Sequence, residues 1–221
     1  GLVGEQEVDV VGDQIQEVYD LHFPGMAAAE KRLAAVEVLR QVGISDPERR
    51  MADYPHQLSG GMRQRVMIAM ALACKPDILI ADEPTTALDV TIQAQILEQI
   101  KALQEKTGMA VLLITHDLGV IAAICDAVVV MYAGKVVESA PVLDLFDRPL
   151  HPYTRGLLAS IPRLESEPKT PLHIISGMVP ELGNMPVGCR FHNRCPHVMG
   201  ICRQAPPPDV TPEPGRSVAC H

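Results

Sequence analysis

The segment ILIADEPTTALD, residues 78–89, determines the expected fold. Its first four residues are all apolar and show no alternation, so we expect a strand that is buried on both faces of its sheet. A second apolar run, AVLLI at residues 110–114, follows a segment at 90–106 whose apolar residues recur with the period of a helix. Strand, helix and strand in this order are typical of a parallel sheet with a helical crossover. We therefore expect an α/β fold around this segment.

Further elements are expected on both sides of this core. Ser59 is a favourable N-cap for a helix that Pro76 would end. Residues 127–132 and 135–138 flank an Ala-Gly pair and predict an antiparallel hairpin. Beyond about residue 160 the chain has no long periodic segment, so we expect it to be rich in loops. Additional helices are predicted over residues 13–22, 26–42, 118–124, 141–147 and 152–160.

Composition excludes several classes of protein. A chain of 221 residues that is 47% hydrophobic can bury a core and form one domain, or a domain and a half. Its net charge of −8 argues against general nucleic-acid affinity. The absence of Trp and an aromatic content of 3% argue against stacking of bases or sugars as the main function. No apolar run approaches the roughly 20 residues that a membrane-spanning helix needs.

Three clusters of residues could bind or activate phosphate. Ser59-Gly60-Gly61 at a helix start offers free N–H groups and the positive end of the helix dipole, although a lone cluster of this kind is more often an ordinary helix cap. Asp82-Glu83 follows a buried strand, at the sheet edge where α/β proteins bind ligands; a solvated acidic turn is the alternative. His116 follows the second buried strand, where a single histidine is more often structural.

Taken together and in this order, the clusters LSGGMRQ (58–64), ILIADEPTTALD (78–89) and LLITHD (112–117) resemble the ATPase subunits of ATP-binding-cassette (ABC) transporters. The resemblance covers residues 12–221 and implies ATP and Mg²⁺ as cofactors. It implies that Glu83 is the general base for the hydrolytic water and that His116 orients the γ-phosphate. The other implied roles are Mg²⁺ binding by Asp82, a dimer-crossing loop at Asp89, and contact with ATP held by a partner subunit through the signature residues Ser59, Gly60, Gly61 and Gln64.

The phosphate-cradling pattern G-x-x-x-x-G-K-[ST] does not occur in these 221 residues. The one Gly-Lys pair, Gly134-Lys135, lacks both the upstream glycine and the following hydroxyl residue. Neither Gln6 nor Gln14 has the context of the family's glutamine loop. We therefore expect a partial P-loop NTPase cassette that neither binds ATP tightly nor hydrolyses it as an isolated 221-residue chain.

The C-terminal part carries a second resemblance. HPYTRGLL at 151–158, GCRF at 188–191 and RCP at 194–196 are similar to the His-Pro-Tyr extension of the oligopeptide/dipeptide importer branch, which also includes nickel importers. Proline and cysteine become frequent after about residue 140. We expect a helical subdomain over 1–75, the remaining ATPase core over 76–140, and a cysteine-containing extension over 141–221.

Four of the six cysteines lie in this extension with the spacing C-x5-C-x6-C-x17-C: Cys189, Cys195, Cys202 and Cys220. Disulfides are disfavoured if the protein works in a reducing cytosol. Unligated buried thiols are the simplest alternative, and a zinc site usually shows tighter pairs, although His192, His197 or His221 could substitute for a ligand. A [4Fe–4S] cluster tolerates varied spacing, and some members of the resembled branch carry one at matching cysteines. We favour the cluster, with zinc second and a structural role for either.

The main functional prediction is the ATP-hydrolysing subunit of a peptide importer, peripheral on the cytoplasmic face of the inner membrane. The resemblance implies transmembrane permease subunits and a second, homologous ATPase subunit as partners. An extracytoplasmic binding protein would take part indirectly, and no nucleic acid is expected. The alternatives are a nickel or other metal importer ATPase, a non-transport cassette ATPase, and a metal-bound interaction module.

Overall fold

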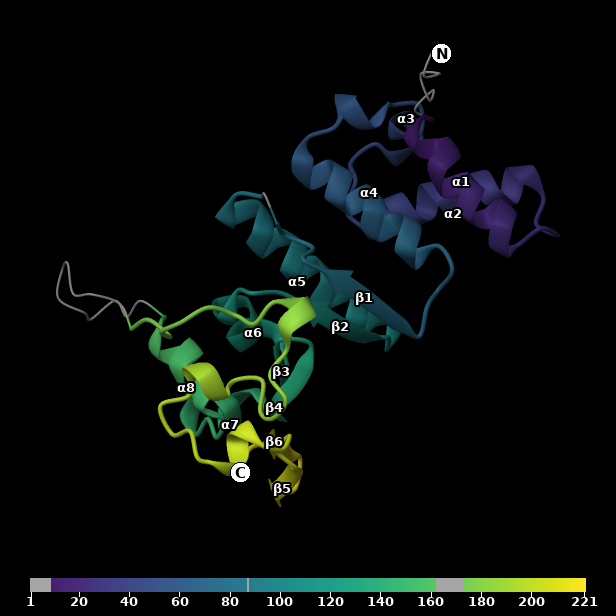
Figure 1. Ribbon diagram of the computed structural model, residues 1–221. Coiled ribbons are helices and arrows are strands. Elements are labelled where there is room, and N and C mark those ends of the chain that lie inside the picture. The colour runs from purple at the N-terminus through teal and green to yellow at the C-terminus, as the bar shows by residue number, and fades with distance from the viewer. Residues whose placement is uncertain (1–8, 87, 162–172) are drawn as a thin grey trace, which may run out of the picture. The chain divides into compact units, whose positions relative to one another are not determined.

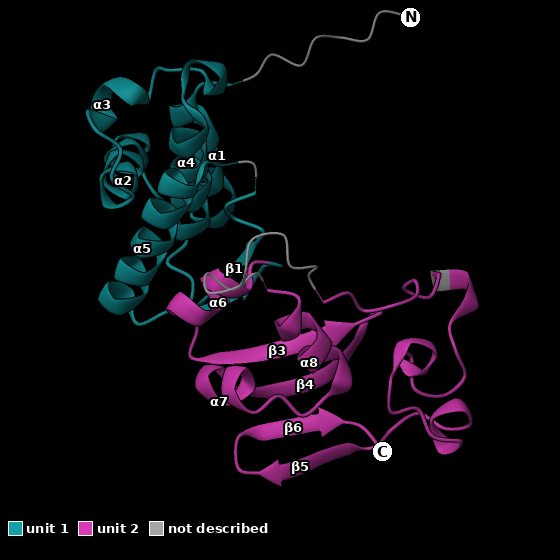
Figure 2. Cartoon of the chain, turned by 90° about the vertical axis from the view of Figure 1, so that its left-hand side faces the viewer, with its two compact units in different colours: residues 1–116 teal, residues 117–221 magenta. Residues whose placement is uncertain are grey.

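The computed structural model describes residues 9–86, 88–161 and 173–221 (Figure 1). The chain divides into two compact units, residues 1–116 and 117–221 (Figure 2). Ala87 of the second motif and Gln6 lie outside the described residues. Each unit is described by itself below.

The first unit is mainly helical. Its helices pack around apolar side chains that are fully buried, among them Val11, Ile15, Leu39 and Ile96. Ser59 caps α4 as expected, because its hydroxyl accepts a hydrogen bond from the amide of Met62. The helices are α1 (Val11–His22), α2 (Ala28–Gln41), α3 (Pro47–Arg50), the 3-10 turn η1 (Pro55–Gln57), α4 (Gly60–Leu72) and α5 (Val90–Thr107).

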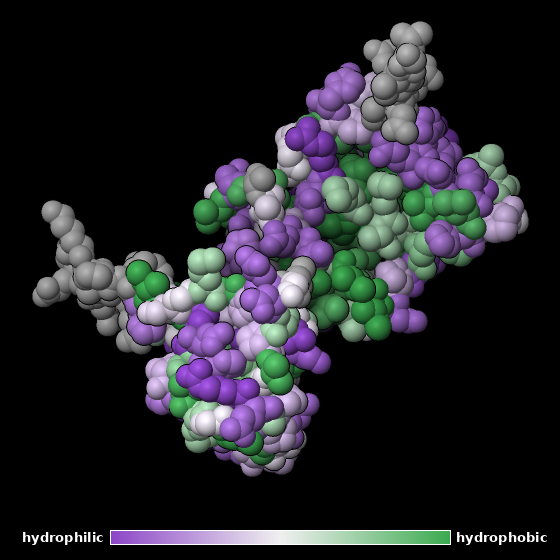
Figure 3. All heavy atoms as spheres, in the orientation of Figure 1, coloured by the Kyte–Doolittle hydropathy of each residue, from purple (hydrophilic) through white to green (hydrophobic). Residues whose placement is uncertain are grey.

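A parallel pair of strands, β1 (Ile78–Asp82) and β2 (Ala110–Ile114), completes the first unit. Helix α5 connects them, as the strand–helix–strand order predicts. The expectation that β1 and β2 are buried on both faces is wrong in this structure. Ile78 and Ile80 of β1 are 62% and 64% exposed, and Leu112 and Ile114 of β2 are 52% and 45% exposed. Leu79 packs into the helical core, whereas no described element covers the opposite face. Figure 3 shows hydrophobic side chains gathered on the surface in the region of these strands.

The second unit is built on a four-stranded antiparallel sheet in the order β3-β4-β6-β5 (Figure 2). The predicted hairpin forms β3 (Ala127–Tyr132) and β4 (Lys135–Pro141). The predicted helices are α6 (Leu118–Ile124), α7 (Val142–Asp147) and α8 (Pro152–Ala159). Three short 3-10 turns follow: η2 (Leu182–Asn184), η3 (His192–Arg194) and η4 (Ile201–Arg203).

The extension is rich in loops as expected, but it also contains two strands that were not predicted, β5 (Asp209–Glu213) and β6 (Arg216–Ala219). Prolines within and beside β5 argue against a strand when only the sequence is considered. The structure tolerates them because β5 is an exposed edge strand. Strand β6 pairs with β4, so the hairpin and the extension share one sheet. The proposed division at residues 75 and 140 stays a prediction, whereas the compact units meet at residues 116 and 117.

Phe191 provides the extension with an apolar anchor. It is 2% exposed and packs edge-on against Tyr132 of β3, with 5.1 Å between ring centroids. Tyr153 of α8 approaches the same ring at 5.5 Å and Tyr132 at 4.7 Å. Three aromatic side chains from separate parts of the second unit therefore share one cluster, which stabilises their mutual position beyond the area they bury.

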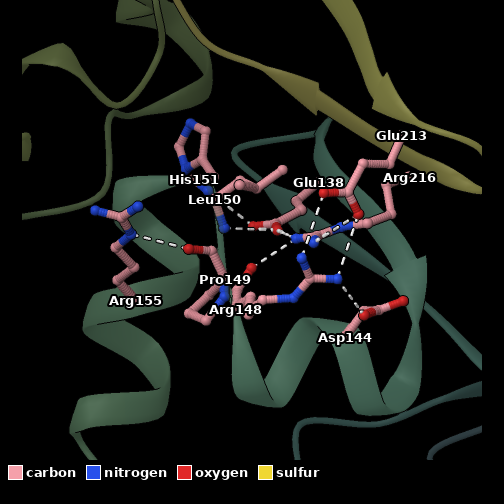
Figure 4. Close-up of polar contacts among 9 residues, drawn as sticks. All are labelled: Glu138, Asp144, Arg148, Pro149, Leu150, His151, Arg155, Glu213 and Arg216. Atoms are coloured by element: carbon pink, nitrogen blue, oxygen red, sulfur yellow. Dashed lines mark hydrogen bonds and ion pairs between the residues drawn. The ribbon is translucent and has the colours of Figure 1, made fainter.

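A buried carboxylate joins the sheet to the loop before α8 (Figure 4). Glu138 of β4 is fully buried, and its two oxygens accept hydrogen bonds from the amides of Leu150 (2.8 Å) and His151 (2.9 Å). Arg216 of β6 lies 3.9 Å from Glu138 and donates to the carbonyl of Arg148 at 2.6 Å. Because a buried charge must be paired and hydrogen-bonded, this carboxylate fixes the turn that precedes α8.

Replacing Glu138 by Ala is expected to lower the free energy of unfolding of the second unit by about 3–5 kcal/mol, because it removes the buried partner of Arg216 and the acceptor of the Leu150 and His151 amides. Glu213→Gln is the matched control: Glu213 pairs with Arg148 and Arg216 but is half-exposed, so a cost of about 1 kcal/mol or less is expected. Urea unfolding followed by circular dichroism, with hydrogen exchange of the Leu150 and His151 amides, measures both. Equal effects of the two substitutions would contradict the role given to Glu138.

Candidate functional site

Glu83 and His116 meet at one edge of the parallel strand pair. Asp82 and Ile114 are register partners at the carboxyl ends of β1 and β2. The amide of Glu83 continues this pairing by donating to the carbonyl of Ile114 at 2.9 Å. One oxygen of the Glu83 carboxylate then lies 3.2 Å from Nδ1 of His116. The strands therefore bring together the two residues that the sequence assigned to catalysis.

The backbone of Glu83 adopts an uncommon conformation. Its φ is +45°, in the left-handed region that residues other than glycine seldom occupy. Strained positions of this kind cluster at functional sites. The conformation turns the chain immediately after β1, and the amide of Thr86 closes the turn by donating to the carbonyl of Glu83 at 3.1 Å.

Two hydrogen bonds hold the Glu83 carboxylate in its ionised form. The Thr86 hydroxyl donates to one oxygen at 2.9 Å, and His116 lies against the other. The Thr86 hydrogen bond first, and the His116 contact second, lower the pKa of Glu83 below its ordinary value. The side chains of Glu83 and His116 are both open to solvent. An ionised, oriented and accessible carboxylate is able to accept a proton from a water molecule.

Asp82 and Asp89 occupy different positions around this edge. Asp82 is the last residue of β1 and is exposed, which is the placement expected of a carboxylate that binds a cation at the sheet edge. Asp89 is the N-cap of α5, and its carboxylate accepts a hydrogen bond from the amide of Ile92 at 2.9 Å. The sequence assigned Asp89 to a loop, and the structure adds this helix-capping interaction.

The signature glycines lie where α4 approaches α5. A Cβ atom on Gly61 would stand 2.8 Å from Cγ2 of Ile92, whereas one on Gly60 would meet Leu88 at 3.4 Å. Gly61 therefore permits a close contact between the two helix starts, a packing role that the sequence did not reveal. Gln64 is half-buried one turn further along α4. Within the described part of the chain, no hydrogen bond or ion pair links Ser59 or Gln64 to Glu83 or His116.

Arg65 is a connecting residue that sequence reasoning missed. Its Nη1 donates to the carbonyl of Val42 at 2.9 Å and to Gln99 of α5 at 2.5 Å. A Cβ on Gly43, where φ is +68°, would stand 2.8 Å from the same nitrogen. The signal available in the sequence was an arginine placed at the start of an apolar helix, next to Gln64.

In the second unit, the four late cysteines line one cavity of about 200 Å³. Cys189 precedes η3, Cys195 follows it, Cys202 lies in η4 and Cys220 follows β6. The cavity is also lined by His151, His192, His197 and His221. None of the described residues forms a group of three or more His, Cys, Asp or Glu side chains that is arranged to hold a metal ion. The structure thus gathers the predicted thiols without placing them as a preformed mononuclear site.

Three of the cavity thiols favour their neutral form. Burial raises the pKa of Cys189, Cys195 and Cys220. The charge that a neighbouring cysteine would carry when ionised raises the pKa of these three thiols further. A metal ion bound among the thiols would lower their pKa instead, because its positive charge stabilises the thiolates that bind it.

The histidine of the HPY motif belongs to the same cavity. His151 is the N-cap of α8, and its Nδ1 accepts a hydrogen bond from the amide of Tyr153 at 3.0 Å. The side chain is almost completely buried, and this burial lowers the pKa of His151 to about 4. The sequence analysis gave this motif only as part of a family resemblance, so the position of the His151 side chain beside the cysteines is a finding of the structure.

No helix in the described part of the chain is both long and apolar enough to cross a bilayer.

Comparison with known families identifies both parts of the chain. Residues 3–86 match the ABC transporter family model, and residues 137–202 match the model of the oligopeptide/dipeptide transporter C-terminal region. The chain is 56% identical over 210 residues to the Oligopeptide transport ATP-binding protein AppD of Bacillus subtilis. This match covers 95% of this chain and 63% of the relative. The chain belongs to the ABC transporter ATPases of the oligopeptide/dipeptide importer family.

Other members of this ABC family have similar names and coverage. The Probable peptide ABC transporter ATP-binding protein y4tR of Sinorhizobium fredii is 54% identical over 213 residues, covering 96% of this chain and 63% of the relative. The Oligopeptide transport ATP-binding protein OppD of Salmonella typhimurium is 52% identical over 210 residues, covering 95% and 62%. The chain therefore spans about three fifths of the length of the curated relatives that it matches.

Solved ABC structures confirm the expected fold class, a partial P-loop NTPase cassette. The dimeric structure of MJ0796, a bacterial ABC transporter cassette, superimposes with a TM-score of 0.52 and 32% identity. The match covers 60% of this chain and 56% of that one. CbiO1 from Clostridium perfringens matches with a TM-score of 0.56 and 28% identity, covering 64% and 54%.

Replacing Thr86 by Val is expected to raise the pKa of Glu83, because it removes the hydroxyl that lowers this pKa. The native pKa lies below the unfolded value, so this hydrogen bond contributes stability above the unfolded pKa and loses it as the pH falls through the folded pKa. Thr85→Val is the matched control on the neighbouring residue. Carboxyl-carbon NMR titration of the 221-residue chain measures the shift. An unchanged Glu83 pKa in Thr86→Val would contradict the assigned contact.

Proposed function

We propose that this chain is the larger part of the ATP-hydrolysing subunit of a peptide ABC importer. The observation that carries the proposal is the contact between Glu83 and His116 at the carboxyl ends of two paired parallel strands. Open α/β sheets bind their ligands at this edge. Phosphoryl transfer to water requires positioning and electrostatic stabilisation more than covalent chemistry, and both are available from oriented side chains here.

Each predicted residue has a role in the proposed reaction. Glu83 accepts a proton from the attacking water, and His116 orients the γ-phosphate while contacting Glu83. Asp82 contributes to Mg²⁺ binding from the end of β1. Across a dimer interface, Asp89 contributes to the loop that contacts the second subunit. The start of α4 contacts the ATP held by that subunit through Ser59, Gly60, Gly61 and Gln64, which agrees with the free amides and positive dipole of a helix N-terminus.

The proposed partners are transmembrane permease subunits and a second ATPase subunit, identical or homologous. The description of the related MJ0796 cassette as dimeric supports the second of these. A site divided between two subunits makes hydrolysis depend on closure of the dimer, and this closure can move the permease. The protein would then lie on the cytoplasmic face of the inner membrane, with the extracytoplasmic binding protein acting indirectly.

Peptide is the preferred cargo over nickel. The relatives described above are named for peptide or oligopeptide transport, and a Bacillus subtilis relative that is 52% identical is named a dipeptide transport protein. The C-terminal family model has the same description. The binding protein and the permease would select among peptides.

The test of the proposed hydrolysis uses the whole ATPase subunit assembled with its permease in lipid vesicles. Glu83→Gln is expected to lower the ATPase rate by roughly 10²- to 10⁴-fold, the usual contribution of a general base, while ATP binding persists. Glu98→Gln, an exposed acid of α5 away from the site, is the control and should retain the wild-type rate. Wild-type hydrolysis by Glu83→Gln would refute the general-base assignment.

We further propose that Cys189, Cys195, Cys202 and Cys220 hold a [4Fe–4S] cluster, with zinc as the alternative. The support is that all four cysteines line one cavity. One zinc ion requires four ligands at about 2.3 Å from a single point. A cubane cluster binds each thiolate at a different iron atom, so it suits thiols that surround a cavity without converging on one point. When bound, the group supplies cross-links between η3, η4 and the end of β6.

The cluster proposal predicts a brown protein after anaerobic purification or reconstitution with iron and sulfide, with broad absorption near about 400 nm. Cys202→Ser is expected to lose this absorption and the bound iron, because Cys202 lines the cavity. Cys74→Ser is the control, since Cys74 lies in the first unit. Metal analysis decides between the alternatives: a colourless protein with stoichiometric zinc would favour the zinc site over the [4Fe–4S] cluster.

A further inference from the structure

The HPY motif has no part in the proposed ATPase reaction, yet its histidine lines the four-cysteine cavity. His151 stands at the junction of the buried carboxylate network and the N-terminus of α8. Its side chain is only 1% exposed. A polar ring that is buried to this extent requires partners for both nitrogens or loses free energy.

The first ring nitrogen is satisfied in a way that fixes the position of the proton. The amide of Tyr153 lies 3.0 Å from Nδ1 of His151. A backbone amide can only donate, so Nδ1 must present its lone pair. A neutral imidazole then carries its proton on Nε2, and this assignment follows from the hydrogen bond itself.

The second ring nitrogen is therefore a donor, and the ring that carries it lines the cavity. No hydrogen bond from Nε2 of His151 to another described residue is present in the structure. Figure 4 shows the ring extending away from the Glu138 carboxylate, which instead accepts from backbone amides. The cavity beyond the ring is lined by sulfur atoms, and a thiolate sulfur accepts hydrogen bonds.

We propose that His151 donates a hydrogen bond from Nε2 to sulfur in the four-cysteine cavity and thereby stabilises the metal group bound there. This inference rests on the metal site proposed above. It gives the HPY motif a chemical role: the turn holds a neutral histidine, with its donor nitrogen free, beside the thiolates.

The surroundings of His151 are suited to holding the ring in place. Glu138 fixes the backbone of the turn through the amide of His151, and Pro152 restricts the backbone of His151, the residue that precedes it. The ring of Phe191 lies 5.7 Å from the imidazole, centroid to centroid. The histidine therefore loses little conformational freedom when its donor finds an acceptor.

The other cavity histidines with assigned contacts are engaged differently. Nδ1 of His192 lies 2.8 Å from the carbonyl of Cys189, and Nε2 of His221 lies 3.2 Å from the carbonyl of Ala205. His221 is also exposed. His151 thus differs from both in combining nearly complete burial with an Nε2 that has no acceptor among the described residues.

A hydrogen bond to a ligating sulfur has a defined effect. It stabilises the extra negative charge of a reduced cluster, and hydrogen bonds to the sulfurs are among the factors that set cluster potentials. It also withdraws electron density from the thiolate, which slows oxidation of the site. The predicted consequence of losing it is a more negative midpoint potential and a shorter lifetime in air.

The test compares His151→Asn with the wild-type chain after reconstitution with iron and sulfide. Asparagine is a favourable N-cap and can still accept from the Tyr153 amide, but its shorter side chain removes the donor from the cavity. His56→Asn, the same change on an exposed histidine of the first unit, is the matched control. Redox titration and decay of the visible absorption in air are the two measurements.

Each outcome bears on the inference. A more negative potential and faster decay in His151→Asn, with His56→Asn unchanged, support it. Equal potentials and lifetimes in a wild-type chain that does hold a cluster overturn the role of His151 and leave the cluster proposal intact. If the wild-type chain holds zinc, the rate of zinc transfer to a chelator is measured in place of the midpoint potential. Equal rates in the wild-type chain and His151→Asn then overturn the role of His151. A chain that takes up neither metal overturns the metal site and this inference together.

A second measurement needs no variant. Nitrogen-15 NMR of the imidazole in the metal-free 221-residue chain distinguishes the tautomers. A neutral ring at pH 7 with its proton on Nε2 is the expected result. A proton on Nδ1, or on both nitrogens, would overturn the inference even if His151→Asn failed to fold.

Discussion

The second unit depends on the burial of one charge, that of Glu138. A carboxylate without solvent must obtain hydrogen bonds and an opposite charge from its surroundings, and these come from separate parts of the chain. Strand β6 delivers Arg216, and the turn before α8 delivers two amides. These contacts to the Glu138 carboxylate place the sheet, the HPY turn and the C-terminal hairpin with respect to one another. The cysteine cavity lies among these elements, so its shape is a consequence of the same requirement.

In the first unit, the corresponding constraint is the parallel pairing of β1 with β2. The register sets Asp82 opposite Ile114, and one more backbone hydrogen bond places Glu83 within reach of His116. The proposed general base and phosphate-orienting residue thus inherit their geometry from the sheet. Loops contribute little beyond the Thr86 hydroxyl.

Much of this arrangement could be predicted from patterns of neighbouring residues. Helix caps, apolar periodicity and the Ala-Gly hairpin turn are local signals, and the elements that they predict are present. Features that depend on distant residues could not be predicted in the same way. Strands β5 and β6 are short and flanked by prolines, and they form because β4 offers an edge. The packing role of Gly61 becomes visible only when Ile92 is seen beside it.

The site was predicted unevenly for the same reason. Motif order sufficed to select Glu83, His116 and the four cysteines, and the structure brings together the first two and gathers the other four. The positive φ of Glu83 and the contact of its carboxylate with Thr86 left no trace in the sequence. His151 was marked by its motif, but its place beside Cys202 and Cys220 in one cavity depends on segments that lie about 50 to 70 residues further along the chain.

The pairing of β4 with β6 also determines when the second unit can fold. About 80 residues separate the two strands, so their contact has a large loop-closure cost and forms late. During synthesis, the Glu138 side chain must wait in solvent until Arg216 has left the ribosome, and the cavity lacks a wall until Cys220 follows. Cys220 directly follows β6, so the proposed metal site can be completed only after this late pairing has formed.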